Sequence, residues 1–339
     1  MKTTATILTL LVILLPVHGE KIAELGEVLK PATMDVGSGR LFIAEGTTIH
    51  IYSLENFKQI KTFGKAGEGP QEFKVSPFGI PLILFEMDGT LYVSSDTKLS
   101  LFTLDGEFIR EIKVPPFQVF VPIAQGKFVA SGTAAGDDQQ MFLNIGLYDE
   151  KVRLVKELYR SDTAVGPNAN FIFPYSSFAF SPQGEEIFVV IGKEGFVIDV
   201  FDLEGKRVRR IQKDTTPLPV PDSYKKSIDD WLKRDPGFKQ FYEFFKTRLK
   251  FKSHFPAIMD MIIENNRIYV FTYKHEGHRY ELIILDLQGK ERGRVRVPIP
   301  GLVGNLFKSP IYAIDRGFYY VLMENEDDEI WELHRVELR

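Results

Sequence analysis

Residues 63–73 form a glycine-rich segment that reads Phe63-Gly64-Lys65-Ala66-Gly67-Glu68-Gly69-Pro70-Gln71-Glu72-Phe73. Its three glycines and one proline lie between two apolar runs, which indicates a loop rather than a helix or a strand. Glycine permits backbone angles that other residues avoid. A second turn-like phrase follows at residues 77–80, and residues 80–85 have the apolar character of a buried strand. We therefore interpret residues 63–80 as a link between two strand-rich units.

The composition limits the classes of partner. At 339 residues the chain is long enough to bury a large core, as one big domain or two ordinary ones. The net charge is -4, from 46 acidic and 42 basic residues. Nucleic acid is not expected as a partner, because binding it usually needs a basic face.

The N-terminus has the features of a signal peptide. Met1-Lys2 supplies a positive end, residues 7–15 form an apolar run too short to span a bilayer comfortably, and Gly19 suits cleavage before Glu20. An N-terminal membrane anchor is the alternative. The chain has no cysteine, which excludes a lipoprotein anchor and means that packing, not disulfides, holds the fold. We expect residues 1–19 to be removed and residues 20–339 to be exported, periplasmic or extracellular, with no transmembrane anchor.

A strand–turn–strand phrase recurs along the chain. Its clearest turns are Asp105-Gly106, Glu204-Gly205 and Gln288-Gly289, and weaker copies occur near residues 55 and 149. Such dipeptides between alternating strands are hairpin signals. With the strands that precede each copy, the chain divides into six units of four strands and roughly fifty residues each. This predicts an all-β, six-bladed β-propeller with four-stranded antiparallel blades, whose last blade is closed by a strand within residues 21–29.

Residues 221–250 break the β pattern. Three prolines lead to Asp222, a candidate helix N-cap, and apolar residues then follow at helical spacing. Pro236 restarts a second helix, in which Phe238, Phe241, Phe245 and Leu249 are expected to share an apolar face. The sequence thus predicts a helical hairpin inserted between blades 4 and 5. It is either a cap packed on the propeller, or a lid or docking surface for a partner.

The antiparallel topology groups the candidate binding residues. In such a blade, the turn between the second and third strands and the link to the next blade lie on one face, where propellers usually bind ligands. We call this the insert face, because the helical insert belongs to it. The candidate ligand-binding residues on its rim are Glu68, Glu72, Asn170, Phe171, Phe173, Tyr175, Trp231, His275 and His278.

Each candidate has a structural alternative. The glycines of residues 64–69 suggest phosphate binding, but the Lys-Ser/Thr of a P-loop is missing and a blade link explains them. His275 and His278 offer two metal ligands or simply a solvated turn. The acidic run 324–329 offers oxygen ligands for Ca²⁺, or a charged hairpin tip that prevents edge pairing. The aromatic residues of 171–175 suit stacking on a sugar or peptide, or core packing.

The link at residues 64–73, the Leu-x-Gly hairpins and the Leu-Tyr-Val strand at 91–93 together resemble secreted bacterial six-bladed β-propellers of the NHL-repeat/TolB-like group. The resemblance covers nearly all of the mature chain. It implies a scaffold or binding module, since most members of the group are of that kind. A minority of similar propellers are lactonases that hold Ca²⁺ with Glu, Asn and Asp side chains. No residues of this chain match that set, so none is carried over.

No motif for catalysis is present. The sequence contains neither Gly-x-Ser-x-Gly nor His-Glu-x-x-His, and a cysteine nucleophile is impossible. The leading hypothesis is a secreted, non-enzymatic binding or scaffold propeller without a cofactor, which engages a protein, peptide or glycan in the cell envelope or outside the cell. The alternative is a Ca²⁺-dependent, lactonase-like hydrolase with its site at the mouth of the central channel. A third hypothesis is a structural module of an envelope assembly.

Overall fold

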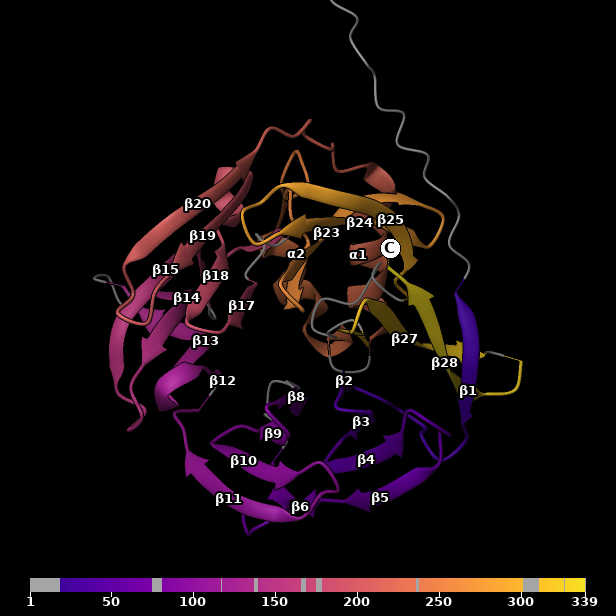
Figure 1. The fold of residues 1–339 in the computed structure, drawn as a ribbon. Coiled ribbons are helices and arrows are strands. Elements are labelled where there is room, and N and C mark those ends of the chain that lie inside the picture. The colour runs from indigo at the N-terminus through magenta and orange to yellow at the C-terminus, as the bar shows by residue number, and fades with distance from the viewer. Residues whose placement is uncertain are drawn as a thin grey trace, which may run out of the picture.

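The computed structural model describes residues 19–74, 81–116, 118–136, 140–165, 169–174, 179–235, 238–300, 311–325 and 327–338. Within them the chain forms six four-stranded antiparallel sheets, arranged as a ring around a central axis (Figure 1). This confirms the predicted six-bladed β-propeller. Among the described residues no helix combines the length and apolar character that crossing a membrane requires. The predicted signal peptide lies, except for Gly19, outside the described residues.

Each blade runs from its innermost to its outermost strand. Blades 1 and 2 consist of β2 (Thr33–Gly37), β3 (Arg40–Glu45), β4 (Thr48–Ser53) and β5 (Gln59–Phe63), then β8 (Ile83–Met87), β9 (Thr90–Ser94), β10 (Lys98–Thr103) and β11 (Phe108–Lys113). Blades 3 and 4 consist of β12 (Val119–Pro122), β13 (Phe128–Ala135), β14 (Met141–Tyr148) and β15 (Leu154–Val165), then β17 (Phe180–Gln183), β18 (Glu186–Val190), β19 (Phe196–Phe201) and β20 (Arg207–Lys213). Blades 5 and 6 consist of β22 (Asp260–Glu264), β23 (Arg267–Glu276), β24 (Arg279–Asp286) and β25 (Glu291–Pro298), then β26 (Tyr312–Asp315), β27 (Phe318–Asn325), β28 (Ile330–Glu337) and β1 (Glu20–Leu25). The strand expected at residues 80–85 is β8, which begins later than predicted.

The N-terminal strand closes the ring, as predicted. β1 pairs antiparallel with β28, and Leu25 lies opposite Trp331. Leu25 and Val28 are each 1% exposed and lie in the apolar core shared by blades 6 and 1. The outermost strand of the last blade therefore comes from the start of the chain, and it covers the edge of β28 where the ring closes.

The core is divided among the six junctions between neighbouring blades. Each junction holds one buried apolar cluster, such as the cluster of Phe42, Phe73 and Phe102 between blades 1 and 2. A blade is thus covered on both faces, which explains strands such as β3 whose four central residues are all buried.

The hairpin glycines are required for two reasons. Gly289 has a φ of +86°, in the left-handed region that favours glycine. A Cβ at this position would also lie 2.5 Å from Cγ2 of Ile211, in the outermost strand of the preceding blade. Gly205 has a φ of +73°, and a Cβ there would lie 2.8 Å from Cδ of Lys156, in the outermost strand of blade 3. These turns therefore pack on the neighbouring blade, which explains why the strand–turn–strand pattern has glycine in its turn in several blades.

Short elements occupy the links between blades. The link after blade 1 contains β6 (Lys65–Ala66) and β7 (Glu72–Phe73), a parallel pair within the predicted loop, and residues 75–80 lie outside the described residues. Single 3-10 turns, η1 (Ala124–Gly126) and η2 (Gly192–Glu194), lie within blades 3 and 4.

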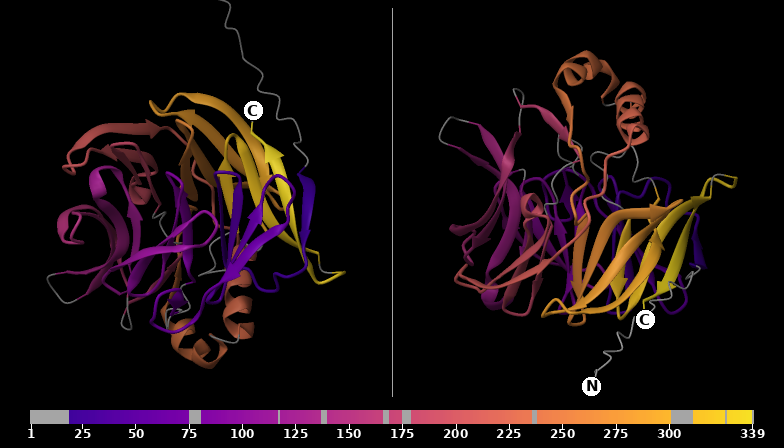
Figure 2. Two further views of the ribbon diagram at one scale, coloured as in Figure 1. Left: turned by 60° about the horizontal axis from the view of Figure 1, so that its bottom comes forward. Right: turned by 90° about the horizontal axis from the view of Figure 1, so that it is seen from above.

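The predicted helical insert lies between blades 4 and 5. It consists of α1 (Asp222–Arg234), the 3-10 turn η3 (Lys239–Phe241), α2 (Tyr242–Arg248) and β21 (Leu249–Phe251). It projects from one side of the ring (Figure 2). β21 pairs in parallel with β16 (Phe171–Phe173), which belongs to the link between blades 3 and 4. This pairing ties the insert to a second inter-blade link.

Two details of the insert differ from the sequence prediction. Asp222 is the first helical residue, not the N-cap, because Pro221 takes the N-cap position and the Asp222 carboxylate pairs with Lys225 instead. Phe241 does not share the apolar face of Phe238, Phe245 and Leu249 but is 53% exposed. The reason is that residues 239–241 form a 3-10 turn, which changes the direction of side chains relative to a continuous α-helix. The expected restart at Pro236 lies outside the described residues.

Candidate functional site

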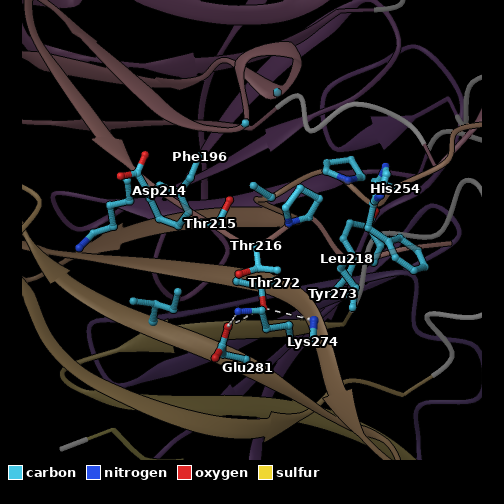
Figure 3. A pocket seen from close by; sticks show the side chains of 18 of the residues that line it. Phe196, Asp214, Thr215, Thr216, Leu218, His254, Thr272, Tyr273, Lys274 and Glu281 are labelled. Carbon is cyan, nitrogen blue, oxygen red and sulfur yellow. Dashed lines mark hydrogen bonds and ion pairs between the residues drawn. The ribbon is translucent and has the colours of Figure 1, made fainter.

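A pocket of about 760 Å³ lies on the insert face between blades 4 and 5 (Figure 3). One wall comes from β23, β24 and β25 of blade 5, and the opposite wall from η2 and Phe196 of blade 4. Residues 213–218, 252 and 254–257, from the two segments that connect the insert to the blades, complete the lining. Backbone hydrogen bonds join these segments, from Phe255 N to Leu218 O at 2.8 Å and from Val220 N to Ser253 O at 3.0 Å.

A buried ionic network lines the blade 5 wall. Glu281 is 8% exposed and accepts hydrogen bonds from Thr272 Oγ1 at 3.0 Å and from Arg294 Nη1 at 2.5 Å. Arg294 also makes two hydrogen bonds to Glu291, each of 3.1 Å. Burial lowers the pKa of Arg294, but its hydrogen bonds to Glu291 and Glu281 outweigh that effect, so its pKa lies above the usual value. Arg294 thus pairs with two carboxylates, those of Glu281 and Glu291, on this wall.

The rim of the pocket is cationic. The Lys274 ammonium is exposed and lies 3.9 Å from Glu281 Oε1, so it borders the buried network from the solvent side. Lys193, on η2, is exposed at the opposite rim. In all, five Lys and Arg residues and three Asp and Glu residues line the pocket, a net charge of +2 on a chain whose net charge is -4.

Aromatic and aliphatic side chains form the apolar part of the pocket. Phe255 stacks on Tyr273 with ring centroids 4.5 Å apart, and Phe196 and Leu218 add apolar surface. Burial raises the pKa of Tyr273, so its phenol is neutral at physiological pH. The pocket thus combines an apolar wall, a neutral hydrogen-bonding group and a positive rim.

The predicted aromatic rim residues lie in the core of the insert. Phe171 and Trp231 are partly buried, and Phe173 is 2% exposed, in one cluster with Ile228 and Leu232. The structure therefore brings together three of the candidates, but as packing partners of the insert. Asn170 is exposed just before β16, and Tyr175 lies outside the described residues.

The predicted Glu68 and Glu72 lie in the link between blades 1 and 2. Glu72 Oε2 accepts hydrogen bonds from the backbone nitrogens of Gly69 at 2.9 Å and Glu68 at 3.1 Å, and Lys65 lies 3.0 Å from Oε1. These contacts lower the pKa of Glu72. The Glu68 carboxylate pairs with Lys74. Glu72 stabilises its own loop, and neither residue lines the pocket.

His275 lies near the end of β23, next to Lys274, and His278 lies in the turn between β23 and β24. His275 Nδ1 is 2.9 Å from the carbonyl oxygen of Gly277, and both histidines are exposed. Across the described ranges, no group of three or more His, Asp or Glu side chains is placed to hold a metal ion. The Ca²⁺-dependent hydrolase stays a prediction, as do the ligand-binding roles of the predicted rim residues.

Carboxylates also gather around the central axis, toward the opposite face. Asp35, Glu86, Glu264 and Asp315 lie on the innermost strands of blades 1, 2, 5 and 6. Asp35 accepts a hydrogen bond of 2.5 Å from the backbone nitrogen of Glu86. Burial, helped by the negative charges of Glu86 and Asp315, raises the pKa of Asp35 to about 7. Burial likewise raises the pKa values of Glu264 and Asp315.

Sequence reasoning missed the pocket. One available signal was Glu281, a charged residue inside the apolar run of residues 280–285. Such a residue in a buried strand needs a partner. The partner Arg294 and the rim residue Lys193 become neighbours of the site only through strand register and blade packing.

Comparisons with known proteins concern the fold alone. No family model matches the chain, and no curated protein matches it. Among solved structures, the chain is similar to regucalcin, a calcium-binding protein from Agrobacterium tumefaciens, with 13% identity over 96% of each chain and a TM-score of 0.44. It is similar to the Cps50 (Swd1) propeller domain from Myceliophteria thermophila, with 11% identity over 94% of this chain and 99% of that chain and a TM-score of 0.42. It is also similar to BamB from Moraxella catarrhalis, with 8% identity over 89% of this chain and 71% of that chain and a TM-score of 0.33.

Proposed function

We propose that the protein is an exported, non-enzymatic binding propeller, which holds a peptide segment with an anionic end in the pocket between blades 4 and 5. The observation that carries the proposal is the pocket itself, with its positive rim and apolar wall. Its volume of about 760 Å³ falls in the range of ligand sites, roughly 300–1,000 Å³. The resemblance of the link at residues 64–73 to NHL-repeat/TolB-like propellers supports a binding module.

Three features favour a peptide as the ligand. Residues 214–217 are exposed and belong to no strand, so their backbone groups are available to an extended peptide. The apolar wall around Phe255 and Tyr273 suits a hydrophobic side chain. Lys193 and Lys274 at the rim suit a carboxylate, such as the C-terminal group of the peptide.

The test is affinity selection from a soluble library of random peptides with free carboxyl termini. We expect selected peptides to bind at least roughly tenfold more weakly to the Lys193→Glu, Lys274→Glu double variant, since each exposed charge pair contributes up to about 1 kcal/mol. Amidation of the peptide terminus should weaken binding to the wild type but have little effect on the double variant.

The matched control is the Lys206→Glu, Lys290→Glu double variant. It changes the net charge equally, on exposed residues of the same two blades, but in turns on the face opposite the insert. It should bind the selected peptides like the wild type. The proposal is wrong if the library yields no binder, or if both double variants bind with equal affinity.

A further inference from the structure

The insert exposes two phenylalanines at its outer surface. Phe241 is 53% exposed and Phe244 is 38% exposed, although the insert has an apolar core of its own. They lie three residues apart in the chain, with Phe241 at the end of η3 and Phe244 in α2. Their neighbour Phe245 belongs to the insert core, where it packs against Phe171 and Phe238. Phe244 also contacts Phe171 and Phe245 edge-on, with ring centroids 6.3 and 5.5 Å apart, so part of its ring packs on the insert and part of it stays exposed.

The segment that carries this pair has more cations than carboxylates. Residues 239–250 contain Lys239, Lys246, Arg248 and Lys250 but only Glu243 as an acidic residue, a net charge of +3. The Arg248 guanidinium carbon lies 4.1 Å from the ring centroid of Phe244, so a cation sits directly beside the exposed aromatic. Lys246 lies 3.9 Å from Glu243, which is the one ion pair formed within this described segment.

The neighbouring helix α1 shows the opposite arrangement. Each of its Lys and Arg side chains pairs with an aspartate of the same helix, in the pairs Lys225–Asp222, Lys226–Asp230, Lys233–Asp229 and Arg234–Asp230. Helix α1 has four cations and three aspartates, a net charge of +1, so most of the excess positive charge lies in residues 239–250, which also expose the phenylalanines. A partner that fits this surface is negative and accepts aromatic side chains.

We propose that residues 239–250 dock the propeller on an anionic lipid surface. Phe241 and Phe244 enter the boundary between headgroups and acyl chains, and the four cations contact lipid phosphates. Exposed aromatic residues flanked by Lys and Arg are typical of this boundary. A protein partner is disfavoured, because a stable interface buries roughly 800 Å² on each partner, far more than two partly exposed phenylalanines provide.

The insert is built to hold this surface in a fixed position. Ile228 and Leu232 of α1 are each 2% exposed in the insert core, and β21 is hydrogen-bonded to β16. The insert projects from the ring, so the blades do not obstruct its approach to a flat surface (Figure 2). Docking would turn the insert face, with the pocket, toward the membrane. The inference does not depend on a ligand in that pocket.

The experiment measures partitioning of the mature chain onto lipid vesicles by sedimentation. We expect binding to vesicles that contain phosphatidylglycerol, little binding to phosphatidylcholine alone, and weaker binding as salt is raised. Lys239→Ser with Lys250→Ser should lower partitioning by roughly 10- to 30-fold, because each cation near an anionic surface contributes about fivefold. Phe241→Ser with Phe244→Ser should weaken binding by at least a similar factor.

Two further variants make the result specific. Lys226→Ser with Lys233→Ser removes two cations of α1 that are already paired, and it should leave partitioning within about twofold of the wild type. Phe241→Trp should gain fluorescence that lipids brominated in their acyl chains quench, which reports insertion directly. The proposal is overturned if the wild type does not bind anionic vesicles at low salt, which is the result expected if the surface binds a protein instead. It is also overturned if the paired and unpaired lysine variants lose binding equally.

Discussion

Replacing Asp35 by asparagine should make the protein more stable at pH 8. Asp35 lies near the axis, where its carboxylate accepts a hydrogen bond from the backbone of Glu86 and faces the negative charges of Glu86 and Asp315. An asparagine oxygen can accept the same hydrogen bond but carries no charge. The substitution therefore removes the cost of ionising a buried group while keeping its contact.

The sign and size follow from the pKa of Asp35, which is about 7 in the folded protein and has an ordinary value of 3.8. Since the pKa is raised, the folded state binds the proton more tightly than the unfolded state between these values. Stability thus falls as pH rises from about 4 to 7, by at most about 1.4 kcal/mol per pH unit and about 4 kcal/mol in total. Above pH 7 this contribution stays constant.

Urea denaturation of the wild type and Asp35→Asn at pH 5, 7 and 8 measures the effect. The difference in free energy of unfolding between the variant and the wild type should grow in favour of the variant as pH rises, and it should approach zero toward pH 4. Some pH dependence should remain, because Glu264 and Asp315 also have raised pKa values. The exposed Asp88 in the adjacent turn provides the control Asp88→Asn, which should not alter the pH profile. An identical pH profile for Asp35→Asn and the wild type would refute the reasoning.

Two further substitutions test how the ring is held together, with urea denaturation as the measurement. Leu25→Ala should lower the free energy of unfolding by about 2–5 kcal/mol, because it leaves a cavity in the closing junction, whereas Leu29→Ala at a 68% exposed site should have little effect. Gly289→Ala should cost about 1–3 kcal/mol more than Gly277→Ala, since both glycines have positive φ but only Gly289 has a side chain, that of Ile211, within 3 Å of the new Cβ. Equal losses within either pair would contradict the packing described for blade closure or for the hairpins.

Most of the architecture can be predicted from short stretches of the sequence. The turns at Gly106, Gly205 and Gly289 are recognisable because positive φ favours glycine, and the flanking strands alternate over a few residues. These short-range signals suffice to count six blades and to find the insert, whose helical spacing interrupts the β pattern. Closure by β1 also follows, because the last unit lacks one strand that residues 21–29 can supply.

The pocket and the surface of the insert depend on contacts that the sequence does not encode locally. The strand register of blade 5 brings Thr272 and Arg294 together, and the packing of blade 5 against blade 4 adds Lys193 to the same cavity. The candidates chosen for their chemistry, such as Phe173, instead fill the core of the insert. Phe241 became exposed because a 3-10 turn precedes α2. The segment at residues 63–73 could therefore identify the propeller, but the binding surfaces arise where separate blades and the insert meet, because side-chain neighbours there are set by packing over long chain separations.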